Sequence, residues 1–375
     1  VQMSPIINPF KLLTLLFILL FLNACSSEKI IIRIINGEVS AAIETDPTPA
    51  SDDTADDPCV WVHPTNPSLS VIIGTDKDEE SAGLRVYDLE GHQIFETEVE
   101  KANNVDLRYG MKVDGVLVDV VTTGLRNSNS LGIYKMNSKT RSLENISARK
   151  ITLGLDVYGS CMYKSPSNIF YAIVNDKEGK VEQYELFESG HGKVDAKLVR
   201  TLQLPGQLEG CVADDILGLL YIGEEEHGIW KFDADPKGST TGVLVDIIGP
   251  NLYADVEGLT IYYSGDSTGY LIASSQGDNT YAIYKREGNN DFIGRFSIAD
   301  NMSIDGSSET DGIDVCNMNL GGKFSSGIFV VQDGVNTNVN SGTKDNTNYK
   351  AVPWGDISSI FTPRLAVNNT YNIRK

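Results

Sequence analysis

The most informative segment of the chain is a carboxylate run, Asp52-Asp-Thr-Ala-Asp56-Asp57, directly before the strand-like stretch Val60-Trp61-Val62. Adjacent aspartates on an extended backbone point to opposite sides, so Asp56 and Asp57 can serve two neighbouring ion sites. Carboxylates this close repel one another unless they are solvated, protonated or bound to a cation. Flexible sites with several carboxylates suit calcium. Taken alone, the segment fits a solvated acidic turn capped by Pro58 at least as well as a calcium site.

Further short motifs follow this segment along the chain. They are Asn103-Asn-Val-Asp-Leu-Arg-Tyr109, Tyr158-Gly159, Asp176-Lys-Glu-Gly179, Glu209-Gly210, Gly223-Glu-Glu225, Asp255-Val-Glu-Gly258, Ser275-Gln-Gly277, Thr310-Asp-Gly-Ile-Asp314 and Val331-Gln-Asp333. Together with the aspartate run they resemble the signatures of the β-propeller phytases, over roughly residues 44 to 360. The resemblance implies an all-β, six-bladed β-propeller and a calcium-dependent phytase of the 3-phytase type.

The resemblance also implies a role for individual residues. The implied calcium ligands are Glu44, Asp56, Asp57, Glu209, Glu225, Asp255, Glu257, Gln276, Asp305 and Asn336. The implied substrate contacts are Lys77, Arg126, Tyr158, Lys177 and Glu178, which with Glu209 and Glu225 form the implied catalytic set. Asp311 and Asp314 stay open between a role near the ions and ordinary turn positions, because Asp-Gly is a common turn.

Basic residues would distinguish a phosphate ester from other substrates. Lys77, Arg126 and Lys177 each follow an apolar run, where a long basic side chain is often only solvated. A guanidinium suits bidentate phosphate binding, whereas an ammonium acts as a point charge. The expected reaction is attack by a water that bridges two of several bound calcium ions, without a covalent protein intermediate. The basic groups would neutralise the phosphoryl oxygens.

Short β-rich runs separated by Gly, Asp and Asn turns must position these residues. An apolar run followed by an amphipathic run recurs as Val71–Thr75 with Gly83–Tyr87, Val116–Thr122 with Leu131–Tyr134, Phe170–Val174 with Gly179–Tyr184, Leu219–Ile222 with Gly228–Phe232, Tyr270–Ser274 with Tyr281–Tyr284, and Gly327–Val331 with Tyr349–Trp354. The copies are about 45 to 60 residues apart, as expected for propeller blades. Each copy carries its acidic or amide motif beside the end of the apolar run, so we expect all motifs on one rim.

The N-terminal region is typical of an exported protein. Lys11 precedes an apolar run, Leu12–Leu22, that is too short to span a bilayer but suits a signal peptide. Leu22-Asn-Ala-Cys25 resembles a bacterial lipobox, which implies a lipidated Cys25; a plain secretory signal is the alternative. The expected segments are a lipoprotein signal peptide over 1–24, a tether over 25–43, the propeller over 44–364 and a C-terminal tail over 365–375. The protein is then expected to be lipid-anchored at the outer membrane or cell surface.

The net charge of −20 argues against nucleic acid or an anionic membrane surface as a direct partner. An acidic protein also repels phytate and other inositol phosphates, the implied substrates, unless basic groups and bound cations reverse the sign locally. Membrane contact is expected only through the lipid, and the protein is expected to be a monomer. Two other propeller functions are alternatives. The carboxylate count and the three basic residues argue against a lactonase with one calcium ion, whereas a non-catalytic surface-binding protein stabilised by calcium stays open.

Five cysteines occur, without the paired spacing of a zinc site. Apart from Cys25, each lies in an apolar, strand-like run. We therefore expect Cys59, Cys161, Cys211 and Cys316 to be buried small hydrophobic residues.

Overall fold

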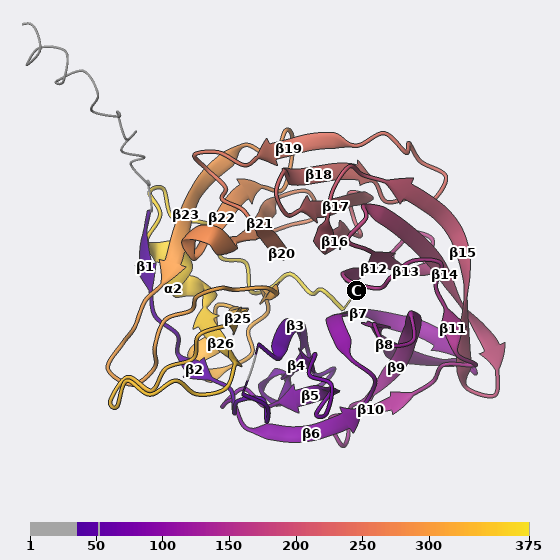
Figure 1. Cartoon of the computed structure of the whole chain (residues 1–375), viewed down its shortest axis with the longest axis horizontal. Helices are drawn as coiled ribbons and strands as arrows, with labels where there is room; N and C mark the ends of the chain where they lie inside the picture. Colours follow the sequence, from indigo (N-terminus) through magenta and orange to yellow (C-terminus); the bar gives the residue numbers. More distant parts are fainter. Residues whose placement is uncertain (1–35, 52, 375) are drawn as a thin grey trace, which may run out of the picture. The chain divides into compact units, whose positions relative to one another are not determined.

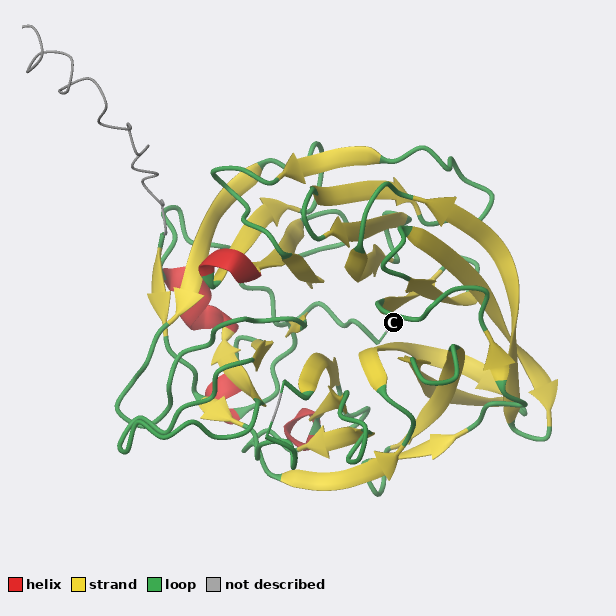
Figure 2. Ribbon diagram, viewed as in Figure 1, coloured by secondary structure: helices red, strands yellow, loops and turns green. Residues whose placement is uncertain are grey.

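The computed structural model describes residues 36–51 and 53–374. Nearly all regular structure in this range is β-strand, in six sheets of four or five strands. The sheets form a ring around a common axis (Figure 1), and helices are few and short (Figure 2). This arrangement confirms the expected all-β, six-bladed β-propeller. The expected signal peptide and Cys25 lie outside the described residues.

Each of the first four blades is one continuous stretch of chain. The first has β3 (Ala55–Trp61), β4 (Val71–Asp76), β5 (Gly83–Tyr87) and β6 (Gln93–Glu98). The second has β7 (Ala102–Val113), β8 (Val116–Leu125), β9 (Ser130–Asn137) and β10 (Ser142–Asn145), with β11 (Ile151–Thr152) on β9. The third has β12 (Ser160–Lys164), β13 (Phe170–Asn175), β14 (Lys180–Gly190) and β15 (Lys193–Gln203). The fourth has β16 (Leu208–Asp214), β17 (Leu219–Glu224), β18 (Gly228–Asp233) and β19 (Val243–Ile247).

The last two blades combine strands from both ends of the described chain. The fifth has β20 (Val256–Tyr263), β21 (Gly269–Ser275), β22 (Thr280–Lys285) and β23 (Phe292–Ile298), with β1 (Gly37–Val39) parallel to β23. The sixth has β24 (Ile313–Cys316), β25 (Ile328–Asp333) and β26 (Asn348–Pro353), with β2 (Ile43–Glu44) antiparallel to β26. β2 thereby closes the ring, and β1 lies within the stretch expected as a tether. Within residues 36–51 and 53–374, the helices are η1 (Pro67–Leu69), η2 (Gln276–Asp278), η3 (Gly322–Phe324) and α2 (Trp354–Ser359). None of them has both the length and the apolar character that crossing a bilayer requires.

Packing between blades explains the apolar runs in the sequence. All six expected strand pairs occur as antiparallel pairs within one blade. Both faces of a blade press against its neighbours, so the two strands nearest the ring axis are apolar at consecutive positions instead of alternating. Val71, Ile72 and Ile73 in β4 are all completely buried, for example. Because the first two strands of each blade run antiparallel, the start of the first and the end of the second lie on the same rim.

The C-terminal residues, yellow in Figure 1, run to the centre of the ring. The ring of Tyr371 stacks on Tyr263, with centroids 5.7 Å apart. Arg374 donates to the carbonyl of Val62 (2.6 Å) and to the carboxylate of Asp119 (2.8 Å). Val62 and Tyr263 lie at or beyond the far ends of the inner strands β3 and β20. The tail therefore covers the end of the ring opposite the acidic motifs.

Replacing Arg374 with alanine is expected to lower the melting temperature and leave activity unchanged. Hydrogen bonds to charged groups contribute about 1.5–3 kcal/mol each, which for a domain of this size corresponds to roughly 2–5 °C. Differential scanning calorimetry would measure the shift, with the exposed Lys112→Ala as the control. A melting temperature equal to that of the wild type would show that the tail contributes no stability through this contact.

Candidate metal centre on one rim

The inner strands of four blades carry one extra residue at the same place beside the rim. In β3 the register passes from Ala55 opposite Asp76 to Pro58 opposite Gly74, which leaves residues 56 and 57 facing a single residue of β4. The same shift encloses residues 103–104 in β7, 209–210 in β16 and 257–258 in β20. Such β-bulges re-aim side chains and are common next to functional sites. Each of these bulges contains at least one of the polar residues that the sequence singled out.

Glycine in these motifs lets neighbouring inner strands touch. A Cβ atom at Gly210 would overlap the carbonyl oxygen of Glu257, and one at Gly159 would overlap that of Glu209. Any larger residue would push the two blades apart. Gly159 and Gly210 thus let the backbones of successive blades approach closely beside the rim.

Three buried glutamates from the fourth and fifth blades converge on the rim. One carboxylate oxygen from each of Glu209, Glu225 and Glu257 lies within 4.8 Å of the other two. Burial raises the pKa of Glu225 to about 7, and burial together with Glu209 raises the pKa of Glu257. Oε2 of Glu257 is buried without a hydrogen-bond donor among the described residues. Three crowded carboxylates, one of which has an oxygen that accepts no hydrogen bond, fit a hard divalent cation such as calcium.

A second set of carboxylates surrounds Lys77, which lies just after β4. Its Nζ is 2.9 Å from carboxylate oxygens of Asp53, Asp56 and Asp311. Burial by itself would lower the pKa of the Lys77 ammonium, but these carboxylates raise it above its ordinary value. Burial raises the pKa of Asp56 in spite of Lys77. Asp311 also accepts from Nε2 of Gln276 at 2.8 Å, so its position at the rim is more than that of a simple turn.

Asn103, in the bulge of β7, connects the glutamates to the basic residues. Its Nδ2 donates to Oε1 of Glu209 (2.7 Å), and its Oδ1 accepts from Nη1 of Arg126 (3.0 Å). In the sequence, Asn103 stands out only as the first residue of a motif, and Asp53 has no predicted role. A polar residue in front of an apolar strand was the only signal available for either.

Arg126 and Lys177 lie over the ring of Tyr158. Nζ of Lys177 is 4.0 Å from the ring centroid, and Cζ of Arg126 is 5.1 Å from it. Burial and the neighbouring Glu209 raise the pKa of the Tyr158 phenol, which stays protonated. The structure therefore brings three of the predicted substrate-contacting residues together. Glu178 is exposed on the turn after β13, and its carboxylate contacts no other site residue among those the structure describes.

Asp57 and Asp314 hold inner strands of adjacent blades together. Oδ2 of Asp57 accepts from the backbone N–H of Val105 (3.0 Å), and Oδ2 of Asp314 accepts from that of Val60 (2.7 Å). Both aspartates line a cavity of about 440 Å³ that extends through the ring to Tyr371 in the C-terminal tail. The sequence left the role of Asp314 open. In the structure, its carboxylate connects the sixth blade to the first.

Glu44, Asp305 and Asn336 do not join the glutamate cluster, because they lie on the sixth blade. The ammonium of Lys350, completely buried, pairs with Asp305 and Asp333. Burial raises the pKa of the Glu44 carboxyl group, and the positive charge of Lys350 offsets part of this increase. Nδ2 of Asn336 donates to the carbonyl of Asn346 at 2.7 Å. Glu44, Asp305 and Asp333 therefore form a separate acidic cluster around Lys350.

Asp255 lies closer to the glutamate cluster. Burial, with Glu226 and Glu209 nearby, raises the pKa of its carboxyl group. Its backbone carbonyl accepts from the N–H of Gln276 at 3.0 Å. Asp255 and Gln276 therefore lie side by side on the fifth blade, one near the glutamates and the other bound to Asp311.

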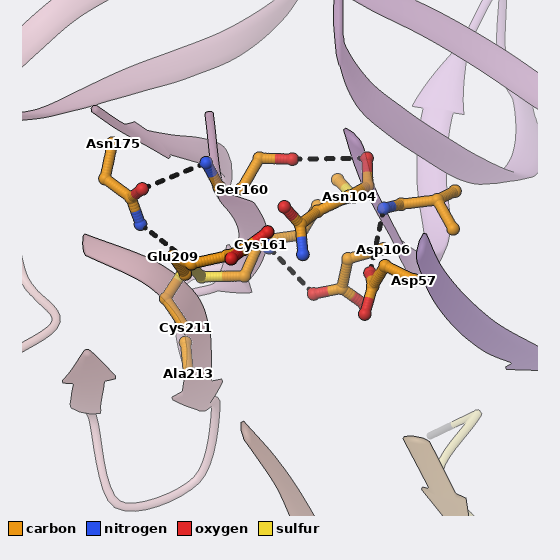
Figure 3. Close-up of a disulfide and its surroundings, with 12 residues drawn as sticks. Asp57, Asn104, Asp106, Ser160, Cys161, Asn175, Glu209, Cys211 and Ala213 are labelled. Carbon is orange, nitrogen blue, oxygen red and sulfur yellow. Dashed lines mark hydrogen bonds between the residues drawn. A yellow bond between two sulfur atoms is a disulfide. The ribbon is translucent and has the colours of Figure 1, made fainter. Parts of the chain in front are cut away.

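The expectation for the cysteines is wrong for two of the four. Cys161 and Cys211 form a disulfide between β12 and β16 (Figure 3), whereas Cys59 and Cys316 are buried and free, as expected. The paired residues are 50 positions apart and belong to different blades. Their proximity results from the packing of two sheets, which local sequence patterns do not encode.

Comparisons with known proteins were made for the whole chain. A family model described as Phytase matches residues 10–375. The 3-phytase of Bacillus subtilis (strain 168) is 43% identical over 345 residues, which cover 90% of this chain and 89% of that protein. Among solved structures, a luciferin-regenerating enzyme aligns with a TM-score of 0.52 over 84% of this chain and 96% of its own, at 11% identity. That last likeness concerns the fold alone.

Proposed function

Because this chain belongs to the phytase family, we propose that it hydrolyses phosphate monoesters of phytate, myo-inositol hexakisphosphate, with several calcium ions at the acidic rim. The proposal rests on one observation: buried glutamates that fit a divalent cation share a hydrogen-bonded network with basic side chains. Asn103 connects Glu209 of that cluster to Arg126. A site that combines cation ligands with phosphate-binding groups suits a highly charged polyphosphate.

Each group at the rim has a defined task in this proposal. Glu209, Glu225 and Glu257 would hold the metal, which when bound lowers the pKa of a water and offsets phosphate charge. Arg126 and Lys177 would bind phosphate oxygens, with the ring of Tyr158 as their platform. Asn103 would keep Glu209 and Arg126 in a fixed relation. Lys77 would compensate charge between the first and sixth blades and reach a phosphate from there.

Phosphate release from phytate tests the proposal directly. Purified protein should release inorganic phosphate with calcium present and lose that activity in excess chelator. Activity should return when calcium is added back. Protein that binds calcium but releases no phosphate would instead support a non-catalytic binding propeller.

Arg126→Ala is expected to reduce kcat/KM for phytate by tenfold or more and to melt near the wild type. A charge-assisted phosphate contact contributes roughly 1.5–3 kcal/mol, about one to two decades in kcat/KM. The loss should be smaller on an aryl phosphate, which has no second phosphate. The exposed Arg364→Ala is the matched control. An equal loss on both substrates would place Arg126 at the scissile phosphate, and no loss on either would make it a surface residue.

Calcium binding is expected to strengthen as the pH rises from about 5 to 8. Burial raises the pKa of Glu225 from 4.5 to about 7, so the folded, metal-free protein keeps a proton there that the unfolded chain has lost. This proton stabilises the folded state fully below about 4.5, and the contribution disappears as the pH passes 7. Metal-free protein should therefore melt at lower temperature as the pH rises, while the increase in melting temperature on adding calcium grows. Thermal melts across this range would measure both, and an increase independent of pH would contradict the assignment.

We also propose that the protein is exported, lipid-anchored through Cys25 at the outer membrane or cell surface, and monomeric. The lipobox-like Leu22-Asn-Ala-Cys25 supports the anchor. The Cys161–Cys211 disulfide supports export, because disulfides persist mainly in oxidising compartments. Labelled palmitate should be incorporated into the wild type and not into Cys25→Ala, and light scattering would give the oligomeric state.

A further inference from the structure

The Cys161–Cys211 disulfide joins two inner strands that share no backbone hydrogen-bond ladder. Cys161 belongs to β12 of the third blade and Cys211 to β16 of the fourth, and each blade is a separate sheet. Their Cα atoms are 5.7 Å apart, and both side chains are buried. Apart from the chain itself, the bond is the one covalent connection between blades in the described part of the protein. The relative position of these two strands therefore depends on how two separate sheets pack against each other.

This bond lies directly beside the bulge that presents Glu209. Cys211 is the first residue of β16 back in register after the bulge, opposite Ile222 of β17. On the other strand, Cys161 follows Tyr158 by three positions. The disulfide therefore ties β16, which carries Glu209, to β12, which begins shortly after Tyr158.

A hydrogen-bonded link accompanies the disulfide at the same junction (Figure 3). Nδ2 of Asn175 donates to the carbonyl of Glu209 (2.8 Å), and its Oδ1 accepts from the N–H of Gly159 (3.0 Å). At neighbouring junctions, carboxylates accept from backbone N–H groups of the adjacent inner strand: Asp57 accepts from Val105, and Asp106 accepts from the N–H of Met162 at 2.8 Å. Between the third and fourth blades, the carboxylate link comes from Asp215 at the far end of β16, to Lys164. Near the rim, the disulfide takes that place.

We propose that the Cys161–Cys211 disulfide is a positioning crosslink of the metal centre. It holds the strand that presents Glu209 in place against the strand that follows Tyr158, so its loss weakens calcium binding in a protein that still folds. The inference rests on the proposed calcium-dependent function. Both cysteines act through Glu209 and contact neither substrate nor metal themselves.

The test compares Cys161→Ser/Cys211→Ser with the wild type and with Cys316→Ser, a buried free cysteine, as the matched control. Non-reducing peptide mapping of the wild type should first find the Cys161 and Cys211 peptides linked. Calorimetric calcium titrations are then run at a temperature where circular dichroism shows every variant folded. We expect at least one class of calcium sites to weaken tenfold or more in the double variant, and kcat/KM for phytate to fall with it. Cys316→Ser should bind calcium like the wild type.

A double-mutant cycle separates positioning from general stabilisation. If the disulfide acts through Glu209, removing it from a Glu209→Gln protein should change calcium affinity by less than twofold. A role in stability alone would lower the melting temperature in both backgrounds and leave the affinity of the folded protein unchanged. Should the serine variant not fold, Cys161→Ala/Cys211→Ala replaces it, without a buried hydroxyl.

Three outcomes would overturn the inference: unlinked peptides, wild-type calcium affinity in the folded double variant, or full additivity with Glu209→Gln. In each, the wild type still binds calcium and releases phosphate, so the proposed function stands. Wild-type protein that neither binds calcium nor hydrolyses phytate would overturn the proposed function and this inference together.

Discussion

Glu209→Gln is expected to reduce phytate turnover by at least ~100-fold while the propeller stays folded. Glutamine keeps the size of the side chain but removes its charge from a cluster whose oxygens lie within 4.8 Å of one another. Even groups behind metal ligands typically contribute 10- to 100-fold, so a direct ligand should contribute at least the upper end of that range. The substitution also changes the acceptor for Nδ2 of Asn103, and with it the position of Arg126. Steady-state kinetics with phytate at saturating calcium would measure the loss.

Glu226→Gln provides a matched control for this substitution. Glu226 carries the same charge, follows Glu225 directly and is exposed outside the cluster. It should keep nearly normal activity, and circular dichroism should show both variants folded. Turnover close to that of the wild type in Glu209→Gln would remove Glu209 from the catalytic set.

Removal of calcium is expected to lower the melting temperature by about 10 °C or more. Each site that binds only the folded state stabilises it by about 2.7 kcal/mol at a hundredfold excess of ligand over Kd. Several such sites together correspond to a shift of this size in a domain of this length. Glu209 and Glu257 come from different blades, so a shared ion would also oppose the separation of those blades.

Calorimetry of chelator-treated protein, before and after calcium is restored, would measure this shift. Magnesium at the same concentration controls for ionic strength and should restore less, because it prefers a rigid octahedral shell with retained waters. Identical melting curves with and without calcium would contradict the whole metal assignment.

The central hairpin of each blade could be predicted from sequence because it is a local structure. Val71–Thr75 pairs with Gly83–Tyr87 within a single short stretch of chain, and such hairpins are encoded by apolar runs and turn residues. The common rim followed from the same reasoning, since an antiparallel strand returns to the edge where its partner began. Residue type then indicated the chemistry there: Glu209, Glu225 and Glu257 were predicted to hold cations, and the structure brings them together.

Contacts between blades could not be predicted in this way. Lys77 was predicted to contact phosphate, but its carboxylate partners include Asp311, which is 234 positions away. Asp305 was grouped with the calcium ligands, yet it pairs with Lys350 on the sixth blade. The local periodicity of the sequence gives no signal for either of these ion pairs.

The difference has a physical cause. Within a hairpin, backbone hydrogen bonds join consecutive strands, so periodicity and turn chemistry carry enough information to locate a Glu or an Arg at the rim. Between blades, contacts depend on how whole sheets pack and on bulges of a single residue, which leave no repeating pattern. Sheet packing therefore determines which carboxylates pair with Lys77 and Lys350, which ones are left to bind a metal ion, and which of four similar cysteines form a disulfide.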